Sequence, residues 1–234
     1  MESVIEQYVK ENSICYVVRQ SSCEKKTIYE FCKRVFDVAA AFFMGIILVI
    51  PMLLIAGYVR LDSRGPAIFK QERLGLNGKP FTIYKFRTMY TNAEENGPQW
   101  AERIDYRCTR AGHILRKTRM DELPQLWNIF IGDMSFVGPR PEMLENVYSY
   151  TEDLPEFKYR LRVKAGLTGY AQIAGKYNTS PKDKLVLDLM YIEKYSLWLD
   201  FKLILQTVTV LLKASDSTEA FGQGEFKYRF TRED

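Results

Sequence analysis

Two adjacent carboxylates, Asp121 and Glu122, stand among cationic side chains and are the first candidates for chemistry in this sequence. The cations grouped around them are Arg116, Lys117, Arg119 and Arg140. Arginine can bind phosphate through two parallel hydrogen bonds, so the cluster indicates a phosphorylated ligand. A carboxylate can attack phosphorus, which makes Asp121 the candidate nucleophile. Glu122 supplies further carboxylate oxygens, the type of donor that hard cations prefer.

Asp121 also has a purely structural interpretation as the N-cap of a helix. Leu126, Trp127 and Phe130 follow at helical spacing, and Pro124 would then lie in the first turn, where a missing N–H costs little. Asp followed by Glu is common at helix starts. Both interpretations stay open on the pair alone. The arginines favour a phosphate site, which the positive end of a helix dipole would favour as well.

Several longer motifs in one order resemble the bacterial sugar transferases called monotopic phosphoglycosyl transferases. The motifs are Tyr84 to Met89, Arg116 to Leu123, Gly132 to Ser135, Val137 to Pro141 and Gly166 to Gly169. The resemblance covers about Lys33 to Lys213. It implies that Asp121 attacks the β-phosphorus of a UDP-sugar and releases UMP, that undecaprenyl phosphate then takes the phospho-sugar, and that Mg²⁺ is the cofactor. It also implies a place in capsule, exopolysaccharide or glycoconjugate assembly.

Four basic residues are candidates for binding the substrate phosphates. Arg116 and Arg140 can hold phosphate oxygens by the geometry of their guanidinium groups. Lys85 and Arg87 alternate along an expected strand and so project from one face. Such a pair is often a solvated face, whereas the resemblance implies that both join the phosphate site.

Two further residues enter the candidate site through the resemblance. Asp188 matches an active-site aspartate of the family, although an acid among apolar neighbours ordinarily indicates a salt bridge. Gln172 follows Gly166-Leu167-Thr168-Gly169, a stretch that lies near the nucleotide in the family, and is a candidate uridine contact. The glycines there would let the backbone approach a ligand closely.

The segment Val38–Val59 contains 22 residues without a charge, about 33 Å as a straight helix, and predicts a membrane element. A buried core helix is the alternative. Basic residues flank it on both sides, which a spanning helix usually avoids, and Pro51 should bend it. A helix that enters and leaves by the cytoplasmic leaflet therefore fits better than a kinked spanning helix. The resemblance implies the same, a re-entrant helix broken at a proline, although the family commonly has Ser-Pro where this chain has Ile50-Pro51.

The remaining pattern predicts a β-hairpin and a series of helices. The hairpin covers 67–89, with its turn at Gly75-Leu76-Asn77-Gly78. Ser180-Pro181 should begin a helix as N-cap and N1, and Arg34 and Asp37 should pair one helical turn apart. Helices are expected at 99–107, 114–118, 143–150, 154–163, 180–195 and 197–213, and a strand-like run after a turn at 166–172. The last helix is either core or an in-plane membrane helix, for which Trp198 is suited.

The predicted fold class is α+β and mostly helical, with a re-entrant membrane helix broken at Pro51, a small β-hairpin and a cytosolic catalytic domain with amphipathic interfacial helices. We expect an N-terminal extension at 1–27, the membrane helix at 28–60, the catalytic domain at 61–214 and a polar tail at 215–234. The expected location is the inner membrane, with the active site on the cytoplasmic face.

Composition narrows the function further. Lys and Arg number 33 against 29 Asp and Glu, a net charge of +4 without the concentrated basic face that nucleic acid needs. The four cysteines form no CxxC pair, so reduced thiols are expected and zinc is not. A non-catalytic membrane-surface module that binds anionic lipid is the alternative function. The motifs do not identify the transferred sugar. They are compatible with a homo-oligomer.

Overall fold

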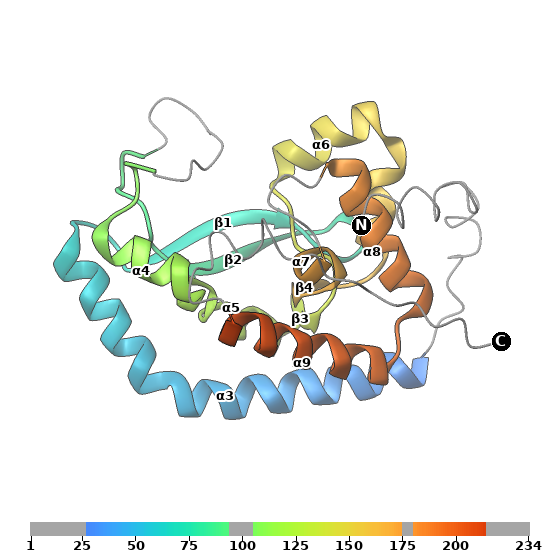
Figure 1. Ribbon diagram of the computed structural model, residues 1–234, viewed down its shortest axis with the longest axis horizontal. Coiled ribbons are helices and arrows are strands. Elements are labelled where there is room, and N and C mark those ends of the chain that lie inside the picture. Colours follow the sequence, from blue (N-terminus) through green and yellow to red (C-terminus); the bar gives the residue numbers. More distant parts are fainter. Residues whose placement is uncertain (1–26, 94–104, 175–179, 214–234) are drawn as a thin grey trace.

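The computed structural model describes residues 27–93, 105–174 and 180–213, a mostly helical α+β protein with two small two-stranded sheets (Figure 1). The predicted fold class is therefore confirmed in its secondary structure. The predicted C-terminal tail, the N-terminal extension up to residue 26 and most of the predicted helix 99–107 lie outside the described residues. The end of that helix is wrong, because Asp105–Arg107 form a turn instead.

Helix α3 (Thr27–Asp62) carries the apolar segment and has Pro51 in its interior. It is one continuous helix with a bent course (Figure 1), so the predicted break at Pro51 is corrected to a bend. Proline removes one hydrogen bond and clashes with the preceding turn, yet the ladder resumes beyond it. The helix is long and apolar enough to cross a membrane. Only 6% of an apolar 18-residue stretch of α3 is buried in the protein, which contradicts the alternative of a core helix.

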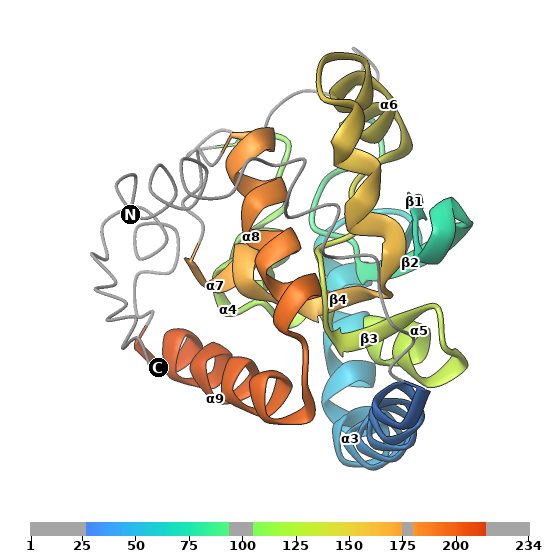
Figure 2. The same ribbon diagram turned by 90° about the vertical axis from the view of Figure 1, so that its right-hand side faces the viewer.

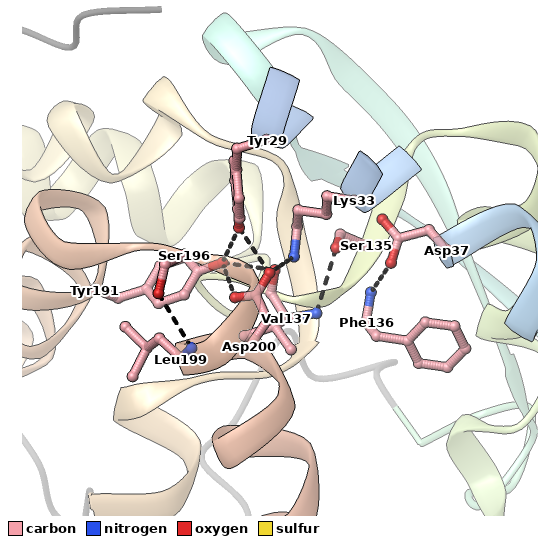
Figure 3. A network of polar contacts seen from close by, with 10 residues as sticks. All are labelled: Tyr29, Lys33, Asp37, Ser135, Phe136, Val137, Tyr191, Ser196, Leu199 and Asp200. Atoms are coloured by element: carbon pink, nitrogen blue, oxygen red, sulfur yellow. Dashed lines mark hydrogen bonds and ion pairs between the residues drawn. The ribbon is translucent and has the colours of Figure 1, made fainter. Parts of the chain in front are cut away.

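The N-terminal turns of α3 are fastened to the rest of the protein by polar contacts. Tyr29 and Lys33 both reach the Asp200 carboxylate at 2.6 Å, and Asp37 accepts a hydrogen bond from the Phe136 amide at 3.2 Å (Figure 3). Arg34 donates instead to the carbonyls of Ile129 and Phe130. The predicted pairing of Arg34 with Asp37 is therefore wrong.

The reason for the Arg34 correction lies in helix α5 (Gln125–Ile131), whose last carbonyls lack partners within the helix and carry the negative end of its dipole. A guanidinium that reaches these carbonyls gains two hydrogen bonds, at 2.7 and 2.8 Å, that a surface ion pair does not offer.

The C-terminal end of α3 is fastened to the same body. Arg87 donates to the carbonyls of Ser63 and Arg64, and the Asp62 carboxylate accepts from the Ala111 amide at 3.0 Å. Val59 is fully buried against Phe86, Ala111 and Leu115. Both ends of α3 thus dock onto one body while the middle of the helix stays exposed.

Strands β1 (Ile68–Leu74) and β2 (Pro80–Phe86) form the predicted antiparallel hairpin, in the register Ile68 with Phe86 through Leu74 with Pro80. The connecting 3₁₀ turn η1 (Leu76–Gly78) has Asn77 and Gly78 at positive φ, as the Asn-Gly signal predicts. Asn128 of α5 ties this hairpin to the helix: its side chain accepts from the Tyr84 amide and donates to the Thr82 carbonyl.

Helix α4 (Arg110–Thr118) begins four residues before the predicted start, because the Thr109 side chain caps it by accepting from Gly112 N. It ends at Arg119 in the left-handed conformation, and the 3₁₀ turn η2 (Met120–Glu122) follows before α5. The N-cap position of α5 is Pro124. The prediction of Asp121 as N-cap is therefore wrong.

Strands β3 (Met134–Val137) and β4 (Ala165–Thr168) pair in parallel and were not predicted as strands. The turn expected at the start of 166–172 is part of β4, and the strand-like run expected after that turn lies in the short helix α7 (Tyr170–Ala174), so both predictions are wrong. Gly138 and Gly166 let the two backbones approach closely, since a Cβ on Gly166 would lie 2.1 Å from Gly138 N.

The remaining helices complete the body around the two parallel strands. Helix α6 (Leu144–Asp153) and the 3₁₀ helix η3 (Pro155–Arg162) correspond to the helices expected at 143–150 and 154–163. Helix α8 (Pro181–Lys194) is capped by Ser180 as predicted, and α9 (Leu197–Lys213) follows. Seen from two sides, α3 and α9 both lie along the lower side of the molecule (Figures 1 and 2). The exposed apolar face of α9 consists of Leu197, Trp198, Phe201, Leu205 and Val208.

Candidate active site

Asp121 and Glu122 lie side by side in η2, in the bend between α4 and α5, and each is 9% exposed. Arg119 makes this bend possible by adopting φ 59°, a conformation that is uncommon for a residue with a side chain. The backbone at functional sites often holds such sparsely populated conformations. Two acids are thereby turned together into a largely buried position that an ordinary helix cap does not require.

Glu122 is held by two cations from two different elements. Lys85 on β2 approaches its Oε1 atom at 3.1 Å, and Arg140 donates to both of its carboxylate oxygens. Burial alone would raise the pKa of Glu122, but Arg140 and Lys85 outweigh it and hold this pKa well below its usual range. Glu122 is therefore a fixed negative charge at neutral pH, and it keeps the two cations in place.

Asp121 has a different environment from its neighbour. Its Oδ1 atom is buried and accepts no hydrogen bond. Burial raises the pKa of Asp121 above its usual value, the charge on Glu122 raises it further, and Lys85 and Arg140 only partly oppose this. A buried carboxylate oxygen without a partner is energetically unfavourable, and a ligand that binds there would explain it. The pair thus consists of one carboxylate that two cations hold and one whose Oδ1 atom is available to a ligand.

Arg140 lies in the irregular turn between β3 and α6, flanked by Pro139 and Pro141. Three successive residues of this turn are held from other elements. Gly138 N donates to the Thr168 carbonyl at 2.8 Å, the Pro139 carbonyl accepts from Gly166 N at 2.9 Å, and the Arg140 carbonyl accepts from Arg160 at 2.8 Å. The guanidinium that meets Glu122 therefore extends from a fixed backbone.

The structure brings together four of the residues predicted for the site, namely Asp121, Glu122, Lys85 and Arg140. Arg116 donates its Nε to Thr88 Oγ1 at 3.0 Å instead of pairing with either carboxylate. Arg87 is 4% exposed, and its guanidinium caps the end of α3. The side chains of Lys85 and Arg87 reach different partners, Glu122 for the first and the end of α3 for the second, so Arg87 does not join the carboxylate pair.

Asp188 and Gln172 lie behind the turn that carries Arg140. Asp188 is 1% exposed and pairs with Arg160, whose Nε and second guanidinium nitrogen lie 2.8 and 2.7 Å from its Oδ2 atom. Asp188 is thus in the salt bridge that its apolar neighbours indicated. It is connected to the Arg140 backbone only through Arg160. Gln172 of α7 donates weakly to the Gly138 carbonyl at 3.4 Å, and its Oε1 atom is buried without a partner.

Two residues of this group were not singled out from the sequence. Arg160 lies in a stretch rich in basic residues, yet it is 1% exposed and contacts the Phe157 ring at 4.9 Å. Asn128, fully buried, positions the strand that carries Lys85. The sequence signal that could have identified Asn128 is an asparagine inside an otherwise apolar helix. Nothing local distinguishes Arg160 from the less buried basic residues beside it, Lys158, Arg162 and Lys164.

The residues present fit a magnesium ion only together with substrate. Among the residues that the structure describes, no group of three or more His, Cys, Asp or Glu side chains could hold a metal. Mg²⁺ is commonly held by one or two carboxylates and the phosphates of the substrate. Asp121 Oδ1 has no hydrogen-bond partner, and Glu122 Oε2 accepts from Arg140 alone, which leaves it a lone pair. The donor set therefore suits this cation.

A buried carboxylate pair beside two cations, in a mostly helical α+β fold, is an arrangement that suits the binding of phosphate groups. A comparison with protein families matches residues 28–214 to the family described as bacterial sugar transferase. The match covers most of the chain, and the chain belongs to the bacterial sugar transferase family. The resemblance of its motifs to this family is thereby confirmed.

Curated relatives give the same result. One from Aeromonas hydrophila, a UDP-N-acetylgalactosamine-undecaprenyl-phosphate N-acetylgalactosaminephosphotransferase, is 41% identical over 79% of this chain and 44% of its own length. One from Caulobacter vibrioides, a UDP-glucose:undecaprenyl-phosphate glucose-1-phosphate transferase, is 42% identical over 79% of this chain and 71% of its own. An uncharacterised sugar transferase of Bacillus subtilis is 42% identical over 77% and 87%. The chain thus spans less than half the length of the first of these relatives.

Proposed function

We propose that this protein transfers a sugar-1-phosphate from a UDP-sugar to undecaprenyl phosphate through a phospho-sugar intermediate on Asp121. The observation that carries the proposal is the difference between the environments of the two carboxylates. Glu122 is held by Lys85 and Arg140, whereas the Oδ1 atom of Asp121 has no partner. The relatives from Aeromonas and Caulobacter are named for the same type of transfer, with different sugars.

In the first step, an Asp121 carboxylate oxygen forms a bond to the β-phosphorus of the UDP-sugar. The bond between this phosphorus and the oxygen bridging to the α-phosphate breaks, and UMP leaves with the electron pair. In the second step, a phosphate oxygen of undecaprenyl phosphate attacks the same phosphorus and regenerates the Asp121 carboxylate. The sugar C1–O bond stays intact throughout, and neither step requires a proton.

The surrounding charges have distinct tasks in this reaction. Two anions must approach each other, so fixed positive charge lowers the barrier. Arg140 and Lys85 are anchored by Glu122 and can turn toward the phosphate oxygens that replace part of that contact. Mg²⁺ held by Glu122 and the substrate phosphates would supply further charge neutralisation. Arg116, which donates to Thr88, is a further candidate phosphate ligand, and Gln172 stays a candidate for uridine.

We propose in addition that α3 is re-entrant, so that both of its ends lie on the cytoplasmic side of the inner membrane. Its first turns contact Asp200, Phe136 and α5, and its last turns contact Arg87 and Ala111. A spanning helix would separate its ends by the ~30 Å hydrocarbon core, and one body on one side could not then hold both. The exposed apolar face of α9, with Trp198 73% exposed, supports contact with the same membrane surface.

This arrangement explains how the two substrates could meet. The nucleotide sugar is water-soluble, whereas undecaprenyl phosphate presents its headgroup at the membrane interface. A site in the body carried by a re-entrant α3 is open to both. The proposed products are UMP and a lipid-linked sugar, as in the first membrane step of capsule, exopolysaccharide or glycoconjugate assembly.

The test is UMP release from a panel of UDP-sugars, with undecaprenyl phosphate and Mg²⁺, by wild type and the Asp121→Asn variant. We expect release by wild type with a preferred sugar, and at least a thousandfold loss in the variant, roughly the effect of removing a nucleophile. Exchange of labelled UMP into UDP-sugar without acceptor would identify the covalent step. Equal release by both proteins would contradict the role of Asp121. No release by folded, membrane-bound wild type would favour a lipid-binding module instead.

A further inference from the structure

Arg160 is a fully buried cation whose position in the fold needs an explanation. It is 1% exposed, in the 3₁₀ helix η3, and its guanidinium contacts the fully buried Phe157 ring. Burying an ion pair is often no more favourable than burying apolar side chains of similar size. Packing alone therefore does not account for an arginine and an aspartate at this place in the core.

The contacts of Arg160 connect Asp188 with the active-site turn. Two guanidinium nitrogens lie within 2.8 Å of Asp188 Oδ2, and one of them also donates to the Arg140 carbonyl at 2.8 Å. The third nitrogen lies 3.9 Å from Glu142, which Lys184 approaches at 2.6 Å. Arg160 thus bridges helix α8 to the backbone of the residue whose side chain meets Glu122.

The turn needs such a bridge because its own sequence gives it few hydrogen bonds. Pro139 and Pro141 have no N–H group to donate. The carbonyls of Pro139 and Arg140 are nevertheless held by Gly166 and Arg160, and together these contacts fix both sides of the Arg140 α-carbon. An arginine fork is suited to this task, since its planar donors can serve a carboxylate and a carbonyl at once.

We propose that Arg160 is a positioning residue that holds the Arg140 backbone for phosphate transfer, and that Asp188 acts through Arg160 without touching the substrate. The role of Arg160 in phosphate transfer rests on the proposed function. Asp188 is 1% exposed and lies behind the turn, so it is not available to a nucleotide sugar. Displacement of the Arg140 guanidinium by a fraction of an ångström would weaken contacts made in the transition state.

The test replaces the whole ion pair by apolar side chains of similar size, Arg160→Met with Asp188→Leu, in the full chain in detergent or lipid nanodiscs. Such replacements often preserve or raise stability, so a merely structural role would be satisfied. Three quantities are measured: the unfolding temperature, the hydrogen exchange of the Gly138, Arg140 and Gly166 amides, and UMP release. Arg162→Met is the matched control, because it removes a guanidinium from the same 3₁₀ helix, where Arg162 lies 4.2 Å from the Tyr159 ring.

We expect the double variant to melt close to wild type, to exchange these amides faster, and to lose at least tenfold in kcat with a smaller change in KM. The control should leave all three quantities close to wild type. Unchanged exchange in the double variant would overturn the proposal, and so would faster exchange with unchanged kcat. If the double variant does not fold, Arg160→Lys replaces it, because lysine keeps the charge beside Asp188 but lacks the planar fork.

Failure of the proposed function gives a different result. Wild type would then release no UMP from any sugar, while the exchange measurement would still decide whether Arg160 holds the turn. Faster exchange in the double variant would support the proposal that Arg160 holds the Arg140 backbone, and unchanged exchange would overturn it.

Discussion

At the scale of single residues, Asp121 and Glu122 have opposite effects on stability although they are neighbours with the same exposure. Asp121 has a raised pKa in the folded protein, so its ionisation at neutral pH opposes folding. Glu122 has a lowered pKa, so its ionised form stabilises the fold. A buried carboxylate oxygen without a partner costs stability, which is the compromise expected of the nucleophile proposed for Asp121.

The first prediction concerns Asp121→Asn, which should raise the unfolding temperature at pH 7. The raised pKa means that the unfavourable contribution of Asp121 is complete above the folded-state pKa. It disappears below the unfolded value of about 3.9. The gain should therefore shrink as the pH falls. Thermal unfolding between pH 4 and 8 measures it, and a variant less stable than wild type at pH 7 would contradict the assigned environment.

Glu122→Gln is the matched variant and should change stability in the other direction. The lowered pKa means that Glu122 stabilises the fold above its unfolded value of about 4.3, and that this contribution is lost as pH falls through the folded-state pKa. Removing one partner of a buried ion pair costs about 3 kcal/mol, and we expect about 2 kcal/mol here because the Arg140 side chain is 37% exposed. A stabilised Glu122→Gln protein would argue against the contact with Arg140 and Lys85.

At the scale of elements, the two parallel strands depend on glycine for their closeness. A Cβ on Gly166 would lie 2.1 Å from Gly138 N and 2.5 Å from both Gly138 O and Thr168 O. These are backbone atoms and cannot turn aside as a flexible side chain would. The same contact holds the start of the turn that carries Arg140, because Gly138 N also donates to the Thr168 carbonyl.

The second prediction follows from this contact. Gly166→Ala should destabilise the fold by about 3 kcal/mol or more, because the strands must separate to admit one methyl group. Gly57→Ala is the control with the same chemical change, since nothing lies within 4 Å of a Cβ at that helical position. It should gain about 0.5–1 kcal/mol from helix propensity. Thermal unfolding in detergent compares the two, and equal effects would show that β3 and β4 tolerate separation.

At the scale of the whole molecule, α3 is held at both ends and exposed in the middle. The polar residues at its start, Tyr29 and Lys33, meet Asp200 of α9, and Tyr191 donates to the other oxygen of that carboxylate at 2.8 Å (Figure 3). At the far end, Arg87 and Asp62 complete the attachment. The helix and the body therefore form one unit with respect to a membrane.

The third prediction tests the re-entrant topology through single cysteines at Glu30, Ile50 and Arg64, in a variant without the four native cysteines. All three positions are exposed in the structure. In sealed, inverted inner-membrane vesicles, an impermeant maleimide should label Glu30→Cys and Arg64→Cys but not Ile50→Cys, which lipid would cover. A spanning helix would instead leave one of the two ends unlabelled until the vesicles are opened.

The sequence by itself determined the features that depend on neighbouring residues. The apolar segment of α3, the Asn77-Gly78 turn and the Ser180 cap follow from local hydrophobicity, backbone preference and capping. The grouping of Asp121 and Glu122 with Arg140 was also predicted from the sequence, although the contact of Arg140 with Glu122 itself was not.

Only the tertiary structure decided the partner of each long charged side chain. Arg34, Arg87 and Asp188 were assigned from their spacing or from the resemblance, yet they bind a helix end, another helix end and Arg160. The parallel pairing of β3 with β4 joins segments about thirty residues apart, and no local pattern reports it. A sequence specifies which groups must find a partner, but the fold brings together residues far apart in the chain and so selects which partner each one meets.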